Sequence, residues 1–497
     1  MPVNPPLHAR INVRLLLWTL LVLIAVATAA TWLGEGPNRQ GPQDRLVVND
    51  ITRLNPIRVG KVVEPQSIGD IMSAIRASSG PISIGGGRNS MGGQTAIENG
   101  LHLDMRLFNK VLSLSPQTQE ITVQSGITWR EIQREIDPLG LSVQIMQTYS
   151  NFTVGGSLSV NVHGRYMGRG PLISSVKSIQ LVLADGSLVE ATPKKNPHLF
   201  YSAIGGYGGI GVITQATLAL ERNEKVERKT FTLRVPDYRD YFMENIRNNP
   251  KVVFHNAYIY PPAFENMRDV SWYVTDKPLT RDERLIPADR KYFLLPKLVD
   301  FTSSVPFGKW IREHLFEPAY YFQDRVVWRN WEASHDVREL GDGDRSNKTY
   351  VLQEYFIPVS NFDRFVPKMR AVFHANNADI LNVSIRHAFA DPGSYLAWAR
   401  EEVFAFVVYH SQGTTAEDKE KVGHWTRQMI DAILSEGGSY YLPYQPHATV
   451  EQFHKAYPGA SKFFAVKRRI DPQNRFQNKL WDKYYSSGEN IKDSRTR

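Results

Sequence analysis

Residues 81–94 read PISIGGGRNSMGGQ, a short β-prone run that leads directly into a glycine cluster. Five of the nine residues from Gly85 to Gly93 are glycine, and Arg88 lies among them. A strand followed by such a cluster indicates a backbone that approaches a ligand closely or adopts positive φ. Successive N–H groups in this kind of turn bind anions. A pyrophosphate is therefore the expected ligand, and a plain tight loop is the alternative.

A second strand and a helix follow this cluster. Residues 121–125 are predicted as a strand that ends at Gly126. Thr128 and Glu131 have the spacing of a capping box, which predicts a helix that begins there and ends near residue 136.

Two more segments continue the glycine-rich half. Residues 153–165, TVGGSLSVNVHGR, combine paired glycines and small hydroxyl side chains with a His-Gly pair. Residues 178–191 alternate on both sides of an Asp-Gly dipeptide, which predicts a β-hairpin. Residues 205–211, GGYGGIG, match the Rossmann pattern literally. That motif must open a helix, whereas residues 212–218 alternate like a strand, so we reject a Rossmann site.

Composition excludes several classes of protein. The chain has 497 residues, of which 42% are hydrophobic and 22% are charged, as expected of a folded protein. Cysteine is absent, which excludes disulfides, thiolate metal sites and cysteine nucleophiles, and we expect no metal site. The net charge is +9, but 59 basic residues are interleaved with 50 acidic ones. Without a nucleic-acid motif, this pattern does not favour a nucleic-acid partner.

The amino terminus carries a run of 19 uncharged residues, LLLWTLLVLIAVATAATWL, at residues 15–33. A bilayer core accommodates about 20 such residues as a helix. Arg10 and Arg14 precede the run, and no acidic residue occurs before Glu35. The positive-inside rule therefore predicts a single-pass membrane protein with its catalytic domain periplasmic or otherwise extracytoplasmic. A signal peptide cleaved in the alanine-rich end of the run is the alternative.

The glycine-rich segments, in this order and spacing, resemble the FAD-binding domain of the vanillyl-alcohol-oxidase or p-cresol methylhydroxylase (PCMH) family. The resemblance covers residues 57–222 and a closing segment at residues 463–480. The nearest branches are the decaprenylphosphoryl-ribose oxidases and the sugar-lactone oxidases. The resemblance implies an α+β fold, with a two-subdomain PCMH-type FAD-binding domain and a substrate domain that contains an antiparallel sheet.

These observations predict a division of the chain into seven parts. They are a cytoplasmic amino terminus (1–14), a transmembrane anchor (15–33), a linker (34–55), the FAD-binding domain (56–222), the substrate domain (223–440), a segment that closes the flavin site (441–489) and a tail (490–497).

The resemblance also implies which residues contact FAD. Those expected around the pyrophosphate are Gly85, Gly86, Gly87, Arg88, Asn89, Ser90 and Met91. Those expected along the diphosphate and the isoalloxazine are Gly126, Thr153, Gly155, Gly156, Ser159, Asn161 and His163. Those expected near the adenine and the flavin edges are Gly205, Gly208, Gly209 and Val212, with Asn478 closing the site from the carboxyl terminus.

One departure from the family concerns the flavin linkage. Many relatives bond the flavin 8α carbon to a histidine that follows the glycine-rich turn, and this chain has Asn89 at that position. An amide nitrogen is not such a nucleophile. We therefore expect FAD to be bound non-covalently.

The second half contains candidate catalytic residues. Lactone and alditol oxidases carry a Glu-x-Arg pair on a central strand, where this chain has Ser384 and Arg386. His447 stands where those relatives have a His-Trp-Gly-Lys segment. Together with His163, these resemblances give Arg386 and His447 as catalytic candidates. This chain has Ser384 in place of the Glu, and it keeps His447 but lacks the Lys of the second segment. Both differences argue against an aldonolactone substrate.

Residues 290–332 mix eleven aromatic residues with seven basic ones. This combination suits a lipid interface. The alternative is that the aromatic residues belong to the core and the basic ones to a solvated face.

The expected function is oxidation of a CH–OH group by hydride transfer to flavin N5, with electrons passed to quinone or oxygen. The expected substrate is a sugar, a polyol or a lipid-linked sugar such as a prenyl-phosphate sugar, and the expected partner is the membrane. Reduction of a polyprenyl or sterol-like double bond, or a flavoprotein without turnover, are the alternatives.

Overall fold

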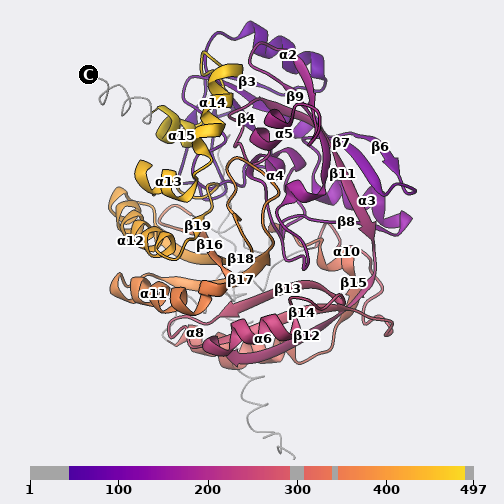
Figure 1. Ribbon diagram of the computed structural model, residues 1–497, viewed down its shortest axis with the longest axis vertical. Coiled ribbons are helices and arrows are strands. Elements are labelled where there is room, and N and C mark those ends of the chain that lie inside the picture. Colours follow the sequence, from indigo (N-terminus) through magenta and orange to yellow (C-terminus); the bar gives the residue numbers. More distant parts are fainter. Residues whose placement is uncertain (1–43, 291–306, 338–344, 487–497) are drawn as a thin grey trace, which may run out of the picture. The chain divides into compact units, whose positions relative to one another are not determined.

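The computed structural model describes residues 44–290, 307–337 and 345–486 (Figure 1). The predicted membrane span at residues 15–33 lies outside this part of the chain. No helix within the described residues is both long and apolar enough to cross a membrane.

The glycine cluster belongs to a small parallel sheet. Its strand order is β3 (Lys61–Val63), β5 (Leu101–Asp104), β4 (Ile82–Gly85). Helix α2 (Ile68–Ala77) connects two of these strands and buries Ile71 and Ile75 against them. The predicted strand at the glycine cluster is β4, and the cluster begins at its carboxyl end.

A six-stranded antiparallel sheet follows, with the order β10-β9-β11-β7-β6 and β8 paired to β11. Its strands are β6 (Val111–Ser115), β7 (Glu120–Gln124), β8 (Leu141–Val143), β9 (Val176–Val182), β10 (Leu188–Ala191) and β11 (Val212–Arg222). The predicted hairpin is confirmed as β9 and β10. The segment after GGYGGIG is strand β11, which confirms the rejection of a Rossmann site.

Helices join these strands at the places that the caps predict. Helix α3 (Trp129–Ile136) begins after Thr128, and Thr128 and Glu131 form the predicted capping box. The segment TVGGSLSVNVHGR, for which the sequence predicted no regular element, forms helix α4 (Val154–Val160). The side chain of Thr153 caps it by accepting a hydrogen bond from the amide of Gly156.

The second half is built on an eight-stranded antiparallel sheet of order β15-β12-β14-β13-β17-β18-β16-β19. Its strands are β12 (Lys225–Arg234), β13 (Val252–Ile259), β14 (Asn266–Val274), β15 (Val326–Trp328), β16 (Lys348–Pro358), β17 (Ile380–Ala388), β18 (Val403–Gly413) and β19 (Ser439–Tyr440). The predicted strands near residues 350–357, 382–387 and 402–409 are β16, β17 and β18. Helices α11 (Phe362–Ala375) and α12 (Ala416–Leu434) cover one face of this sheet (Figure 1).

The carboxyl-terminal segment returns to the glycine-rich half. After α13 (Val450–Ala456) and α14 (Ala460–Ile470), the amide of Ile82 donates to the carbonyl of Arg475 at 2.6 Å. Lys467 is fully buried, and its ammonium donates to Asp471 and to the carbonyl of Gly209. The last described helices, α15 (Lys479–Trp481) and a π-helical turn (Asp482–Ser486), continue from there.

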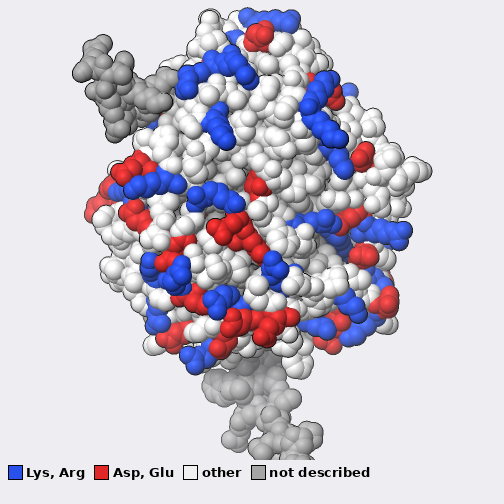
Figure 2. Space-filling view, viewed as in Figure 1, with Lys and Arg blue, Asp and Glu red and all other residues white. Residues whose placement is uncertain are grey.

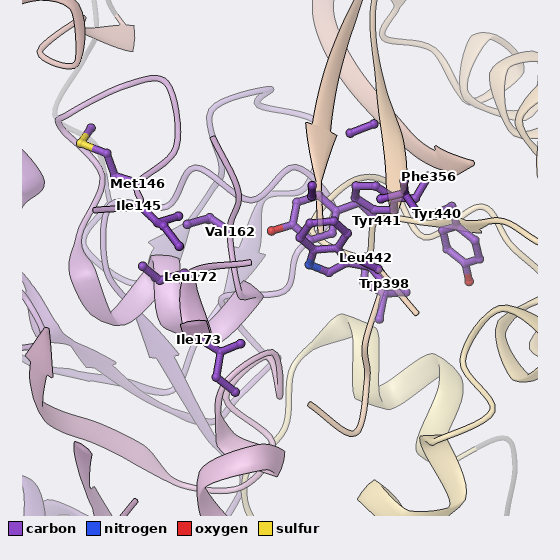
Figure 3. Packing of buried hydrophobic residues seen from close by; sticks show 14 of the residues in the cluster. Ile145, Met146, Val162, Leu172, Ile173, Phe356, Trp398, Tyr440, Tyr441 and Leu442 are labelled. Atoms are coloured by element: carbon purple, nitrogen blue, oxygen red, sulfur yellow. The ribbon is translucent and has the colours of Figure 1, made fainter. Parts of the chain in front are cut away.

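One hydrophobic cluster joins the two halves (Figure 3). Val162 and Leu172 come from the glycine-rich half, and Phe356, Trp398 and Tyr441 come from the second half of the chain. Because apolar side chains from both halves share one core, the halves are held against each other by hydrophobic burial.

The aromatic and basic stretch divides into buried and exposed side chains. Trp331 is 3% exposed, whereas Phe307, Trp310, Tyr320 and Phe322 are 82%, 54%, 55% and 85% exposed. The expectation of a lipid interface and the expectation that the aromatic residues belong to the core therefore each describe only part of this stretch. On the face shown in Figure 2, basic side chains lie among acidic ones rather than in one stripe.

Candidate active site

A long cavity runs between the two halves of the described structure. Its empty volume is about 1550 Å³, part of which is open to solvent. Its lining residues include the glycine cluster and helix α4, and also Glu354 of β16 and Arg386 of β17. The cavity therefore connects the predicted phosphate site with charged side chains of the eight-stranded sheet.

The glycine cluster supplies unpaired backbone donors. The amides of Arg88, Asn89 and Ser90 line the cavity region and have no hydrogen-bond partner within the described residues. The guanidinium of Arg88 donates to Asp104 at 2.8 Å, and Arg88 itself has a positive φ of 55°. All three residues are half-buried, and their free amides are donors that an anionic group can use.

Glycine is required where this turn meets helix α4. A Cβ atom on Gly86 would lie 2.3 Å from Oγ1 of Thr153, the residue that caps the helix. The amide of Gly87 donates weakly to the same oxygen at 3.4 Å. The turn and the amino terminus of α4 are therefore close together.

His163 and Glu354, which also line the cavity, form a buried pair. Nε2 of His163 donates a short hydrogen bond to Oε1 of Glu354, and both side chains are 3% exposed. The Tyr444 hydroxyl donates to Oε2 of Glu354 at 3.1 Å. Burial raises the pKa of the Glu354 carboxyl, but His163, Arg386 and Tyr444 outweigh it and hold that pKa below its usual value.

The sheet register explains why Glu354 and Arg386 share the cavity. Glu354 stands opposite Val407 of β18, and Ser384 stands opposite Val407 from the other side. Arg386 is two residues beyond Ser384, and alternate residues of a strand face the same side. No carboxylate within the described residues pairs with Arg386, and its Nε is buried without a partner.

An aromatic wall fixes the His163 ring. The ring centroid lies 4.9 Å from Trp398, 5.7 Å from Phe356 and 6.1 Å from Tyr441, and these three aromatic side chains cluster in Figure 3. Packing of this kind restricts the imidazole to one orientation, so its hydrogen bond to Glu354 is preorganised.

Most of the residues expected at the flavin line this cavity. They are Gly85, Gly86, Gly87, Arg88, Asn89, Ser90, Met91, Thr153, Gly155, Gly156, Ser159, His163, Gly208 and Asn478. Of the catalytic candidates, Arg386 and His163 line it as well.

Five of the expected flavin contacts do not line it. Asn161 is a C-cap whose amide donates to Asp391 and Ser394, so its side chain holds α4 to a distant loop. Gly205 and Gly209 make turn hydrogen bonds, and Val212 is fully buried in the core of the parallel sheet. Gly126 lines a separate cavity next to Gly87 and three arginines.

His447 is not brought to the cavity either. Its Nδ1 lies 3.0 Å from where a Cβ atom on Gly423 of α12 would be, and its neighbours include Arg427 and His410. Burial, reinforced by these charges, lowers the pKa of His447 to about 3, so the ring is neutral. The family resemblance that suggested a catalytic role for His447 gave no information on the direction in which its ring points.

Sequence reasoning missed Glu354 and Tyr444. The strand at residues 350–357 was predicted, and Glu354 is its only acidic residue. A carboxylate inside an apolar strand is a signal of function or of a buried ion pair. Tyr444 lies in a loop without a pattern, so no signal pointed to it.

The residues of the cavity fit FAD. The free amides at the glycine cluster suit a diphosphate, and the mostly apolar walls between the two ends suit flat rings. Arg386, whose Nε has no hydrogen-bond partner, supplies a positive charge in the lining of the same cavity.

Comparisons with known proteins agree with this geometry. Residues 59–192 match an FAD binding domain family. The chain is 21% identical to L-gulonolactone oxidase of Bos taurus over 84% of its length and 93% of the relative. It is 21% identical to decaprenylphosphoryl-beta-D-ribose oxidase of Mycolicibacterium smegmatis, over 82% of its length and 90% of the relative. L-galactono-1,4-lactone dehydrogenase of Arabidopsis thaliana is 25% identical over 63% of this chain and 49% of the relative.

Proposed function

Since the chain is an FAD-dependent oxidoreductase with a PCMH-type FAD-binding domain, we propose that it oxidises a CH–OH group of a sugar-like, polyol or prenyl-phosphate-sugar substrate. The observation that carries this proposal is the continuous cavity between the glycine cluster and the Glu354–Arg386 end. The names of the relatives support a sugar-derived substrate, since two of them act on sugar lactones and one on a polyprenyl-linked ribose.

In this proposal the glycine cluster, with the free amides of Arg88, Asn89 and Ser90, holds the FAD diphosphate. Bound FAD supplies the oxidant, which accepts the hydrogen and both electrons of the substrate C–H bond. Arg386 orients the substrate or stabilises negative charge, because its guanidinium is close to the cavity and unpaired. The aromatic side chains around His163 exclude water from this end.

The membrane is the proposed location and quinone the favoured electron acceptor, with oxygen as the alternative. The apolar run at residues 15–33 supports the location. The exposed Phe307, Trp310, Tyr320 and Phe322 add to it, because aromatic side chains of this kind favour a lipid–water interface. A membrane location also suits a lipid-linked substrate.

Reduction of a polyprenyl or sterol-like double bond is the second candidate, and the mostly apolar walls of the cavity favour it. Hydroxyl oxidation is favoured over it by the polar cluster of Glu354, His163 and Tyr444, because a hydroxyl needs a proton acceptor and an isolated double bond does not.

Anaerobic mixing with a panel of polyols, lactones and prenyl-phosphate sugars tests the proposal. Bleaching of the flavin absorbance by one class identifies the donor. In Arg386→Lys, which keeps the charge but loses the planar fork, bleaching slows while the FAD content stays at the wild-type level. A flavin that none of these donors bleaches contradicts the proposed function.

A further inference from the structure

We propose that Glu354 is the proton acceptor of this enzyme and that His163 is the residue that positions it. The inference rests on the proposed oxidation of a hydroxyl group, and it concerns a residue that the sequence did not identify. It follows from the contacts of Glu354, His163 and Tyr444 at the charged end of the cavity.

The hydrogen bonds of His163 argue against the histidine itself as the acceptor. Its Nε2 is bonded to Glu354, and its Nδ1 lies 3.3 Å from the carbonyl of Gly164. Nε2 is therefore not left for a substrate hydroxyl, and Nδ1 lies against a backbone carbonyl. The aromatic wall also keeps the ring from turning.

Glu354 has the remaining acceptor capacity. An ionised carboxylate offers about four lone-pair sites, and His163 and Tyr444 occupy two of them. Glu354 also lines the cavity directly. A substrate hydroxyl in the cavity therefore has an accessible carboxylate oxygen as its nearest anionic partner among the described residues.

The groups that face Glu354 keep it ionised. His163 approaches from the loop after α4, Arg386 from β17, and Tyr444 from the carboxyl-terminal segment. Tyr441, Tyr207 and Tyr457 are further titratable neighbours, and burial raises the pKa of each phenol well above its ordinary value, so all three stay neutral. Among the residues that the structure describes, the carboxylate therefore has two cationic or potentially cationic neighbours and no second carboxylate beside it.

Glu354 and the bound FAD together account for the proton, the hydrogen and the electrons that leave the substrate. The O–H bond of the substrate breaks and its proton goes to a carboxylate oxygen of Glu354. The electron pair of that bond becomes the second bond of the carbonyl product. The C–H bond breaks in the same conversion, and its hydrogen leaves with both electrons to the FAD, which is the oxidant.

The alternative is that Glu354 and His163 form a buried pair with only a structural role. The chain contains a matched example outside the cavity, because His387 Nε2 lies 2.7 Å from Glu402 Oε1 and Arg247 also pairs with Glu402. Glu402 does not line the cavity. Glu402→Gln therefore removes a comparable pair from the same sheet without touching the proposed acceptor.

The experiment compares Glu354→Gln with Glu402→Gln and wild type in the full-length, FAD-loaded protein. We expect Glu354→Gln to keep its FAD and its fold but to be bleached by the donor about 10²–10⁴-fold more slowly, the range for loss of a general base. We expect the acid limb of the wild-type pH profile for flavin bleaching to disappear in this variant. Glu402→Gln should bleach at the wild-type rate.

A second measurement does not depend on turnover. In nitrogen-15 histidine NMR spectra, the ring-nitrogen shifts of His163 should differ between Glu354→Gln and wild type, because the carboxylate that Nε2 contacts is gone. Equal bleaching rates in Glu354→Gln and wild type overturn the assignment of the base, and unchanged His163 ring-nitrogen shifts overturn its positioning by His163. A wild-type flavin that no hydroxyl donor bleaches instead overturns the proposed function, and the base with it. If Glu354→Gln unfolds, Glu354→Met, which removes the carboxylate and keeps a side chain of similar length, is compared in its place, and an unchanged rate there also overturns the inference.

Discussion

Glu354 and Ser384 face the same side of the eight-stranded sheet, because each stands directly opposite Val407 of the strand between them. Two strand spacings separate them, which is about 10 Å. The lactone and alditol oxidases that this chain resembles carry a Glu at the position of Ser384. In this chain the carboxylate of Glu354 therefore lies in the same row across the sheet as Ser384, but two strands away from it.

This relationship predicts the behaviour of a double variant. Glu354→Gln alone should slow flavin bleaching by about 10²–10⁴-fold. Adding Ser384→Glu returns a carboxylate to the same face of the sheet, two residues from Arg386, and should recover part of the rate. Stopped-flow bleaching rates of the single and double variants check this. A double variant no faster than Glu354→Gln shows that the position of the carboxylate, and not only its level in the sheet, determines catalysis.

His163→Ala is expected to destabilise the fold more than the loss of a neutral hydrogen bond would. A buried histidine bonded only to backbone would cost about 1–2 kcal/mol. Here the substitution leaves the buried Glu354 carboxylate without its closest hydrogen-bond partner, and removing the partner of a buried charge costs about 3–5 kcal/mol. His163→Gln can still donate to the carboxylate and should lose less stability. Urea unfolding of the two variants measures the difference, and equal stabilities would exclude the lost hydrogen bond to Glu354 as the cause.

The sequence predicted the fold further than the site. Strands and caps around residues 81–222 were predictable because glycine clusters, a capping box and an Asp-Gly turn are local signals. The contacts of Glu354 with His163 and Tyr444 were not predictable, because they join residues 191 and 90 positions apart in the chain. That His447 and Asn161 do not line the cavity was not predictable either, since the direction of a side chain in a loop or a C-cap depends on tertiary contacts.

The flavin is expected to leave the protein on denaturation. Asn89 occupies the position where many relatives have the bonding histidine, and it lines the cavity beside the glycine cluster. Acid precipitation should therefore give a colourless pellet and a yellow supernatant. Asn89→His serves as the comparison, since it restores the nucleophile type. A yellow wild-type pellet would establish a covalent bond from another residue.

The amino-terminal run is expected to hold the chain in a membrane. Arg10 and Arg14 should remain cytoplasmic, because positive residues flank the cytoplasmic end of a span. Alkaline carbonate should leave the protein in the membrane pellet, and protease added to intact cells should reach the main domain but not residues 1–14. A mature amino terminus near Thr31 would indicate a cleaved signal peptide instead.

Stability is expected to fall at acidic pH through Glu332. Burial would raise the pKa of the Glu332 carboxyl, but the charge of Arg165 and the hydrogen bonds from His335 and Arg165 outweigh it and lower that pKa to about 2. Arg165 donates to Glu332 at 2.6 Å, and the side chains of Arg165 and Glu332 are only 13% and 5% exposed. A carboxyl whose pKa is lower in the folded state binds its proton more readily when the chain is unfolded. Ionised Glu332 therefore contributes about 3 kcal/mol to the free energy of unfolding, and this contribution is complete above pH 4.5 and is lost as the pH falls toward 2.

Glu332→Gln tests this assignment. The variant should be less stable than wild type at pH 7, and the gap between the two should narrow as the pH falls from about 4.5 toward 2. Exposed Glu135 provides the control, because Glu135→Gln removes a carboxylate of helix α3 that lies at the surface. The measurement is urea unfolding at a series of pH values. A gap between wild type and Glu332→Gln that stays constant over this range would show that the stability of the pair does not depend on ionisation of Glu332.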